Sequence, residues 1–248
     1  MDFICYLAMT EAEFSCAEVL PVHPAWMACH YSCYGVGLSG LPERMPEGSL
    51  LIVNDRTPPS GHDPQIISQQ LKQFIQQYRL TQVLLDLQRD GLTENHCLAQ
   101  RLVQELGVPV AVSEKYASSL ECPVFLDCPP PYRTLEACAK KWPGRELWLE
   151  LAPEVGIAEV TAEGFIYKSI QQEVSTQFPF YDADLCCKYR TQLYDDRLQV
   201  TMKRDEEALK GLCLQAQTMD IHTFVGLYQQ FGADFTPKHS ANQIPTCK

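Results

Sequence analysis

The sequence predicts a TIM-like (β/α) barrel, and three observations lead to that fold class. Apolar segments rich in Val, Ile, Leu and Phe alternate with helical patterns, which is typical of strands buried on both faces of a parallel sheet. The length of 248 residues is close to the about 250 that such a barrel needs. The strands repeatedly end in a carboxylate or an amide, where parallel α/β folds place their ligands. A doubly wound open sheet is the alternative fold.

The first half of the chain carries the clearest alternation. Asp63 is a side-chain cap followed by Pro64, which suits the first position of a helix because the missing N–H needs no partner there. Gly107 is a favourable residue just after the end of a second helix. The predicted elements are a strand at 3–8, a helix at 10–20, an extended segment at 26–36, a strand at 50–55, a helix from 64 to about 78, a strand at 83–87, a helix at 94–106 and a strand at 108–114.

The second half is less regular, because the helix expected after Glu114 is hardly visible and two hairpin patterns interrupt the alternation. We therefore expect an irregular or incomplete barrel with inserted β-hairpins. The predicted elements are a strand at 123–127, a helix at 134–141, a strand at 147–150, hairpins at 157–170 and 187–202, a helix capped by Asp205 and a closing strand at 224–228. Residues 1–235 are expected to form one domain, and residues 236–248 a C-terminal tail.

Charge and hydropathy exclude several classes of protein. The net charge of −11, from 31 acidic and 20 basic residues, opposes binding to nucleic acid. No stretch approaches the about 18 to 20 apolar residues of a membrane span. The N-terminal segment lacks the basic start of a signal peptide, and Thr10, Glu11 and Glu13 interrupt its apolar run. We expect a cytoplasmic protein without nucleic-acid or membrane partners; the oligomeric state is open.

The twelve cysteines are spread along the chain, several of them within apolar patterns, so we interpret them as reduced, mostly buried thiols. Cys29, His30 and Cys33 form a C-H-x-x-C cluster that is incomplete as a zinc site. Neighbouring strand residues point to opposite faces, so Cys29 and His30 are not expected to pair for catalysis. The sequence also lacks a phosphate-binding glycine loop. We expect neither a metal nor a cofactor.

Polar side chains at the strand ends are the candidate site. Any one of them could cap the following helix or simply point into water. Their recurrence at strand after strand indicates a shared site at one end of the sheet. The residues at these strand ends are Asp55, Asp86, Gln88, Glu114, Asp127 and Glu150.

The segment Val-Leu-Leu-Asp-Leu-Gln-Arg-Asp at 83–90 resembles the signature strand of family 18 glycoside hydrolases, the chitinase-like barrels. The motif of that family ends in Asp-x-Asp-x-Glu. With Asp86 on its last Asp, Gln88 stands at the catalytic Glu, and Leu84 takes the place of the earlier Asp. The closing strand, Gly-Leu-Tyr at 226–228 followed by Asp234, also resembles the last strand of those enzymes with its aromatic platform.

The resemblance implies a carbohydrate site, and Gln88 leaves two hypotheses open. An amide has no ionisable proton and cannot protonate a glycosidic oxygen as a Glu does, which makes classical chitinase activity doubtful. One hypothesis is a glycoside hydrolase in which Asp86 and Glu114, with Glu150, form the acid/base set. The other is a non-catalytic barrel that binds a small sugar-like ligand or a protein partner.

Further residues are candidates for contacting such a ligand. Tyr116, Tyr132, Trp148 and Tyr228 are aromatic residues near the expected mouth that suit stacking on a sugar ring, although core packing is favoured for Trp148. Arg89 and Arg190 suit a ligand carboxylate, and each could equally pair with a neighbouring Asp. The ligand-binding candidates are Asp55, Gln88, Arg89, Tyr116, Asp127, Arg190 and Tyr228.

Overall fold

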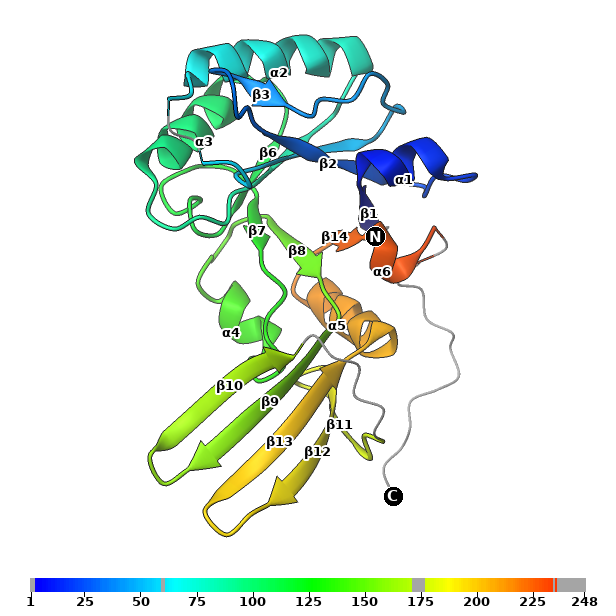
Figure 1. Ribbon diagram of the computed structural model, residues 1–248, viewed down its shortest axis with the longest axis vertical. Coiled ribbons are helices and arrows are strands. Elements are labelled where there is room, and N and C mark those ends of the chain that lie inside the picture. The colour runs from blue at the N-terminus through cyan, green and yellow to red at the C-terminus, as the bar shows by residue number, and fades with distance from the viewer. Residues whose placement is uncertain (1–2, 59–60, 171–176, 234, 236–248) are drawn as a thin grey trace.

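The computed structural model describes residues 3–58, 61–170, 177–233 and 235. Its main sheet is a closed barrel of eight parallel strands, with helices packed around it (Figure 1). The barrel strands are β1 (Ile4–Met9), β2 (Pro24–Tyr31), β4 (Leu50–Asn54), β5 (Val83–Asp86), β6 (Val110–Ser113), β7 (Val124–Leu126), β8 (Leu147–Leu151) and β14 (Thr223–Leu227). The predicted TIM-like barrel is confirmed, and the closed sheet is inconsistent with the open-sheet alternative.

Pairing between the first and last parts of the chain closes the barrel. Strand β1 pairs in parallel with β2 on one side and with β14 on the other. The remaining strands follow in chain order from β2 through β4 to β8, which pairs with β14. The two-residue strand β3 (Leu38–Ser39) adds to β2 in the antiparallel sense. The predicted closing strand is therefore real, and the barrel is irregular but complete.

The strand sequences are apolar on both faces because one face fills the barrel and the other packs under the helices. The barrel interior contains one buried cluster, to which all eight barrel strands contribute small or large residues. Its members are Tyr6, Ala8, Ala25, Leu50, Ile52, Leu84, Ala111, Phe125, Trp148 and Val225. Trp148, only 1% exposed, stacks on Tyr6 at a ring-centroid distance of 6.4 Å. The expectation of core packing for Trp148 is confirmed.

The helices cover the outside unevenly. They are α1 (Glu11–Cys16), α2 (Pro64–Tyr78), α3 (Thr93–Glu105), α4 (Leu135–Ala139), α5 (Glu206–Thr218) and α6 (Tyr228–Phe231). Asp63 caps α2 as predicted, accepting from the Gln65 amide at 2.8 Å. Residues 40–49 and 114–123 contain no helix, which agrees with the missing pattern after Glu114. Helix α1 ends at Cys16 and is therefore shorter than the predicted 10–20. None of its residues is buried.

Both predicted hairpins are present, and they join into one five-stranded antiparallel sheet inserted between β8 and α5 (Figure 1). Its strands are β9 (Glu154–Thr161), β10 (Gly164–Ile170), β11 (Phe180–Asp182), β12 (Cys187–Leu193) and β13 (Arg197–Arg204). The sheet projects from the barrel as a second lobe. The sequence shows the two hairpins separately, whereas the pairing of β9 with β13 that joins them links residues far apart in the chain.

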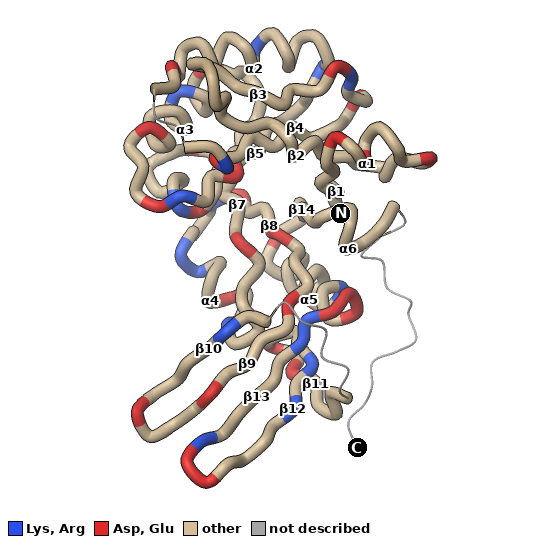
Figure 2. Tube along the Cα trace, in the orientation of Figure 1, with Lys and Arg blue, Asp and Glu red and all other residues tan. Residues whose placement is uncertain are grey.

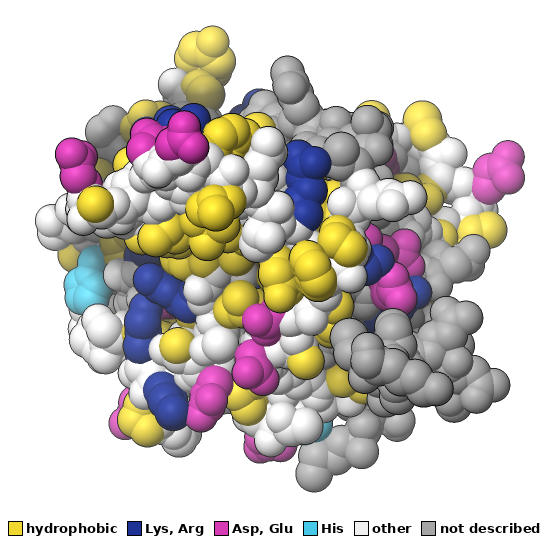
Figure 3. All heavy atoms as spheres, turned by 90° about the horizontal axis from the view of Figure 1, so that it is seen from below, with side chains coloured by type: hydrophobic (Ala, Val, Ile, Leu, Met, Phe, Trp, Pro, Cys, Tyr) yellow, Lys and Arg dark blue, Asp and Glu magenta, His cyan; other side chains and the backbone are white. Residues whose placement is uncertain are grey.

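The far end of the inserted sheet exposes apolar side chains. One row of cross-strand neighbours consists of Phe165, Val160, Leu198 and Leu193, of which Leu193 is 80% exposed. Figure 3, which views the molecule from the side of this lobe, shows hydrophobic side chains gathered across the middle of the surface. Lys and Arg alternate with Asp and Glu over both lobes rather than forming a basic stripe among the described residues (Figure 2).

The prediction of a single domain over residues 1–235 stays a prediction. The expected tail at 236–248 and Asp234, which contributed to the resemblance, lie outside the described residues. Among the helices that the structure describes, none is both long and apolar enough to span a membrane.

Candidate functional site

A cavity of about 280 Å³ opens at the carboxyl ends of the barrel strands. Its floor is apolar, because it is formed by inward-facing barrel residues such as Leu84, Phe125 and Val225. Its polar lining comes from four different parts of the barrel, as expected for a site at this end of the fold. The polar lining residues are Asn54, Asp55, Arg56, Asp86, Gln88, Glu150 and Gln230.

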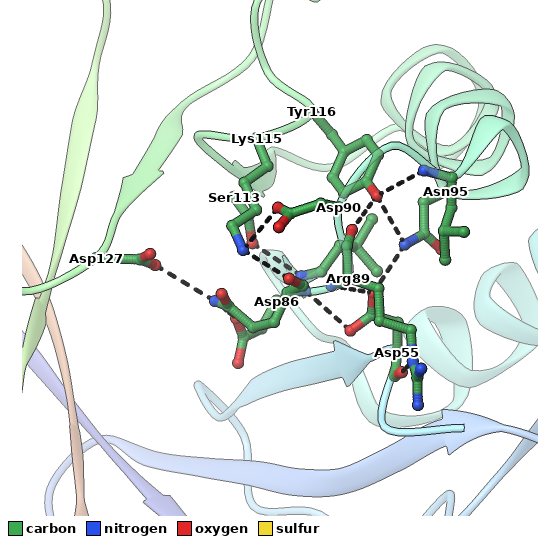
Figure 4. Close-up of polar contacts among 12 residues, drawn as sticks. Asp55, Asp86, Arg89, Asp90, Asn95, Ser113, Lys115, Tyr116 and Asp127 are labelled. Atoms are coloured by element: carbon green, nitrogen blue, oxygen red, sulfur yellow. Dashed lines mark hydrogen bonds and ion pairs between the residues drawn. The ribbon is translucent and has the colours of Figure 1, made fainter. Parts of the chain in front are cut away.

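Asp86 and Gln88 reach this cavity because residues alternate along β5. Leu84 lies in the barrel interior, so Asp86 and Gln88, two and four residues later, continue the same side toward the cavity. The Gln88 Nε2 donates to Asp86 Oδ1 at 2.6 Å and to Asp127 Oδ1 at 3.3 Å (Figure 4). Gln88 therefore holds two carboxylates from different strands with one amide.

The environment of Asp86 favours its protonated form. Burial is the main cause of the raised pKa of this carboxyl, and the negative charges of Asp127 and Asp55 act in the same direction. The hydrogen bond from Gln88 opposes the rise, since it stabilises the charged form. A ligand in this cavity meets a carboxyl group that is easier to protonate than an exposed aspartate.

Glu150, at the end of β8, is the second carboxyl with a perturbed pKa. Its Oε2 accepts a hydrogen bond from the Cys128 amide at 3.1 Å. Burial raises the pKa of Glu150 to about 7, with smaller contributions from the charges of Asp127, Asp86 and Glu154. Perturbed carboxyls that share a cavity are typical of functional sites, although structural networks also produce them.

Asp55 lines the same cavity, but its carboxylate oxygens are hydrogen-bonded to other groups of the protein. This carboxylate is 3% exposed and accepts from the Gln88 amide at 2.9 Å, the Arg89 amide at 2.8 Å and Asn95 Nδ2 at 2.8 Å. Asn95 is in turn held by the Tyr31 hydroxyl, which donates to its Oδ1 at 2.7 Å. Asp55 therefore fixes the backbone that carries Gln88 (Figure 4).

Arg89 and Tyr116 support the same loop and do not line the cavity. The Arg89 guanidinium donates to the carbonyls of Asp55 at 2.8 Å and Arg56 at 2.9 Å. The Tyr116 hydroxyl donates to the Arg89 carbonyl and accepts from Asn95 Nδ2 at 3.3 Å. Their polar groups bond to other parts of the chain and position the loop after β5, and the expectation that both contact a ligand stays a prediction.

Glu114 does not join Asp86, so the expected pair of working carboxyls is not formed. On β6, Ala111 faces the barrel interior while Val112 packs outward, and Glu114 follows the side of Val112. Its carboxylate lies 4.0 Å from the Lys141 ammonium outside the barrel. The strand-end position is as expected, but the alternation along the strand turns the side chain away from the cavity.

Arg190 and Tyr228 also lie outside the cavity lining. Arg190 belongs to β12 of the inserted sheet, paired with Thr201 of β13. Tyr228 begins α6 and packs against the outer apolar cluster, the buried residues between the barrel strands and the helices, such as Leu149, Leu151 and Phe224. In this region, Gln230 is the residue that lines the cavity.

Sequence reasoning missed two residues that position the site. The Ser113 hydroxyl accepts from the Leu87 amide at 2.8 Å and donates to the Leu85 carbonyl at 3.0 Å, which locks the end of β5. The Lys115 ammonium donates to the Gln88 carbonyl at 2.6 Å and pairs with Asp90 at 3.0 Å. A serine inside an apolar strand was the available signal for Ser113; nothing in the sequence pointed to Lys115.

Across the described ranges, no group of three or more His, Cys, Asp or Glu side chains has an arrangement that could hold a metal ion. Cys29 is fully buried within the outer apolar cluster, whereas Cys33 is exposed.

No family model matches this sequence, and no curated protein matches it either. The fold, in contrast, is shared with solved structures. One is a family 18 N-acetylglucosaminidase from Paenibacillus barengoltzii, with a TM-score of 0.57 and 9% identity over 94% of this chain and 96% of that chain. The spore cortex-lytic enzyme SleL from Bacillus cereus has a TM-score of 0.57 and 8% identity over 95% of this chain and 72% of that one.

A class V chitinase from Nicotiana tobaccum is similar as well, with a TM-score of 0.56 and 10% identity over 91% of this chain and 93% of that chain. Identities this low show the fold alone. At the level of the fold, the predicted resemblance to family 18 glycoside hydrolases is confirmed.

Proposed function

We propose that this chain is a glycoside-hydrolase-like barrel that binds a small carbohydrate in the cavity at its strand ends, without classical chitinase activity. The observation that carries the proposal is that Gln88, which lines the cavity, contacts both Asp86 and Asp127. The resemblance places Gln88 where the family has its acid, and an amide there can bind but cannot supply a proton.

The chemistry of the cavity supports a sugar-like ligand. Sugars combine apolar C–H faces with hydroxyl donors and acceptors, and the cavity offers both kinds of surface. Asp86 and Glu150 provide carboxyl oxygens, while Asn54 and Gln230 provide amides. A small cavity with few polar groups on an apolar floor matches the general form of a small-molecule site.

One similar structure shows that this type of barrel can hold a sugar when a glutamate is changed to glutamine. A glutamate-to-glutamine variant of the Nicotiana tobaccum class V chitinase was solved in complex with NAG4; it has a TM-score of 0.55 and 10% identity to this chain. For that protein, the substitution is compatible with the bound ligand. This supports choosing NAG4 as the first ligand to test here.

A relocated acid is the second candidate, favoured by the raised pKa of Glu150, about 7, at the cavity wall. In that case Glu150 would be the general acid of a hydrolase, since its carboxyl is partly protonated at neutral pH. Glu114 is not part of this alternative, because it faces Lys141 outside the barrel.

The decisive experiment measures NAG4 binding by calorimetry and turnover of chromogenic N-acetylglucosaminides on the same preparations. We expect wild type to bind NAG4 without turnover above background, and Asp86→Asn to weaken binding about tenfold, the effect of losing roughly one hydrogen bond to a charged group. Glu114→Gln is the matched control, since it also replaces a carboxyl by an amide, but at a residue that does not line the cavity.

Two results would go against the proposal. If wild type shows turnover and Glu150→Gln abolishes it, the chain is a hydrolase and not a binding protein. Failure of NAG4 to bind wild type at any pH would remove the carbohydrate site and leave the protein-partner hypothesis. The expected cytoplasmic location stays a prediction.

A further inference from the structure

Glu150 is the carboxyl of the cavity that the family resemblance leaves without a role. It lies on β8, next to β7, whose end carries the Asp127 that accepts from Gln88. It lines the same cavity as Asp86 of β5. Leu149 and Leu151 on the same strand are buried in the outer cluster, so the alternation along β8 turns Glu150 inward.

The charged groups around Glu150 are mostly carboxylates. Asp127 faces it from the end of β7, Asp86 from β5 and Glu154 from the start of β9. Asp55 and Arg56 line the cavity from the loop after β4. Within the part of the chain that the structure describes, no lysine or arginine pairs with Glu150 at ion-pair distance.

The nearby arginine on the inserted sheet does not compensate for this charge. Arg204 is buried, and its guanidinium donates to the carbonyls of Cys186 at 3.2 Å, Leu185 at 2.6 Å and Pro129. Its Nη1 also lies 3.6 Å from the Cys128 Sγ. The guanidinium donors of Arg204 are therefore bonded to these carbonyls and do not pair with Glu150.

The hydrogen bonding of Glu150 leaves capacity toward the cavity. Among the described residues, the Cys128 amide is its one hydrogen-bond partner, and that bond goes to Oε2. The other oxygen can carry a proton and donate it to an acceptor in the cavity. The apolar floor beside it, formed by Phe125 and Val225, strengthens such a bond because it excludes water.

We propose that Glu150 meets the ligand as a neutral carboxyl that donates a hydrogen bond to an acceptor oxygen of the sugar, such as an acetamido carbonyl. The inference rests on the proposed carbohydrate site and names the group that recognises the ligand. Its consequence is a binding affinity that falls as the pH rises through about 7, because the deprotonated carboxylate repels the same acceptor.

The test is the affinity for NAG4 between about pH 6 and pH 8.5. Wild type is expected to lose roughly thirtyfold in affinity over this range, the loss for one group that must be protonated and titrates near 7. Glu150→Gln keeps a permanent donor, so it should bind at all pH values with the slope removed. Glu114→Gln is the matched control, because that carboxylate faces Lys141 outside the barrel, and it should keep the wild-type slope.

Each outcome separates this inference from the function on which it rests. An equal pH slope in wild type and Glu150→Gln, or tighter binding at high pH, overturns the role of Glu150 while leaving the carbohydrate site intact. Absence of binding in wild type at every pH overturns the carbohydrate site itself. A carbon-13 titration of the free protein, assigned with Glu150→Gln, adds a ligand-independent readout: a midpoint for Glu150 below about pH 5 overturns the neutral carboxyl.

Discussion

Asp55 differs from the other strand-end carboxylates because the protein uses its oxygens. It accepts from two consecutive backbone amides, those of Gln88 and Arg89, and from the buried side chain of Asn95. Two of these donors belong to the segment that places Gln88 at the cavity, and the third lies on α3. Asp55 is thus a positioning residue, whereas Asp86 and Glu150 keep capacity for a ligand.

We predict that Asp55→Ala lowers the free energy of unfolding by roughly 3 kcal/mol, because it leaves buried donors without an acceptor. Urea denaturation followed by circular dichroism measures the change. Asp90→Ala serves as control; Asp90 is largely exposed and pairs with Lys115, so its loss should cost at most about 1 kcal/mol. Equal stability of the two variants would show that Asp55 does not hold the loop.

At the scale of elements, a buried arginine links the inserted sheet to the barrel. Arg204 ends β13, is 1% exposed, and donates to carbonyls before β12 and in the loop that follows β7. The adjacent Asp205 then caps α5 by accepting from the Ala208 amide at 3.2 Å. These two residues thus connect the end of β13 to the loop after β7 and to α5.

We predict that Arg204→Met lowers the free energy of unfolding by about 3 kcal/mol, because several buried carbonyls lose their donor. Arg204→Lys should recover only part of the loss, since one ammonium cannot reproduce the planar fork of the guanidinium. Arg197→Met, a more exposed position on the same strand, is the matched control and should change stability by less than about 1 kcal/mol. Chemical denaturation compares the variants; a loss for Arg197→Met as large as that for Arg204→Met would contradict the assignment.

For the whole molecule, the cavity carboxyls link stability to pH. Raised pKa values mean that the folded protein holds protons that the unfolded chain releases at the same pH. For Glu150, the folded state binds more protons between about pH 4.5 and pH 7, so stability falls as the pH rises across this window. The stabilising contribution is complete below the window and is lost above it.

We predict that Glu150→Gln is more stable than wild type at about pH 8.5 by roughly 3 kcal/mol, and that the difference disappears near pH 4. The comparison needs urea denaturation of both proteins at the two pH values. Glu114→Gln should show no such pH-dependent gain. A wild type that gains stability relative to Glu150→Gln with rising pH would mean that the carboxylate is stabilised in the fold.

The sequence by itself determined the barrel class, most strand positions and the two hairpins, because these follow from local periodicity, capping and turn residues. It also pointed to Asp86, Gln88 and Glu150, since strand ends in parallel folds meet at one edge. Only the tertiary structure decided that Glu114 turns outward to Lys141, that Asp55 is hydrogen-bonded to backbone amides, and that the hairpins join into one sheet. Side-chain direction at a strand end, burial and long-range pairing depend on neighbours distant in the chain, and no local pattern records them.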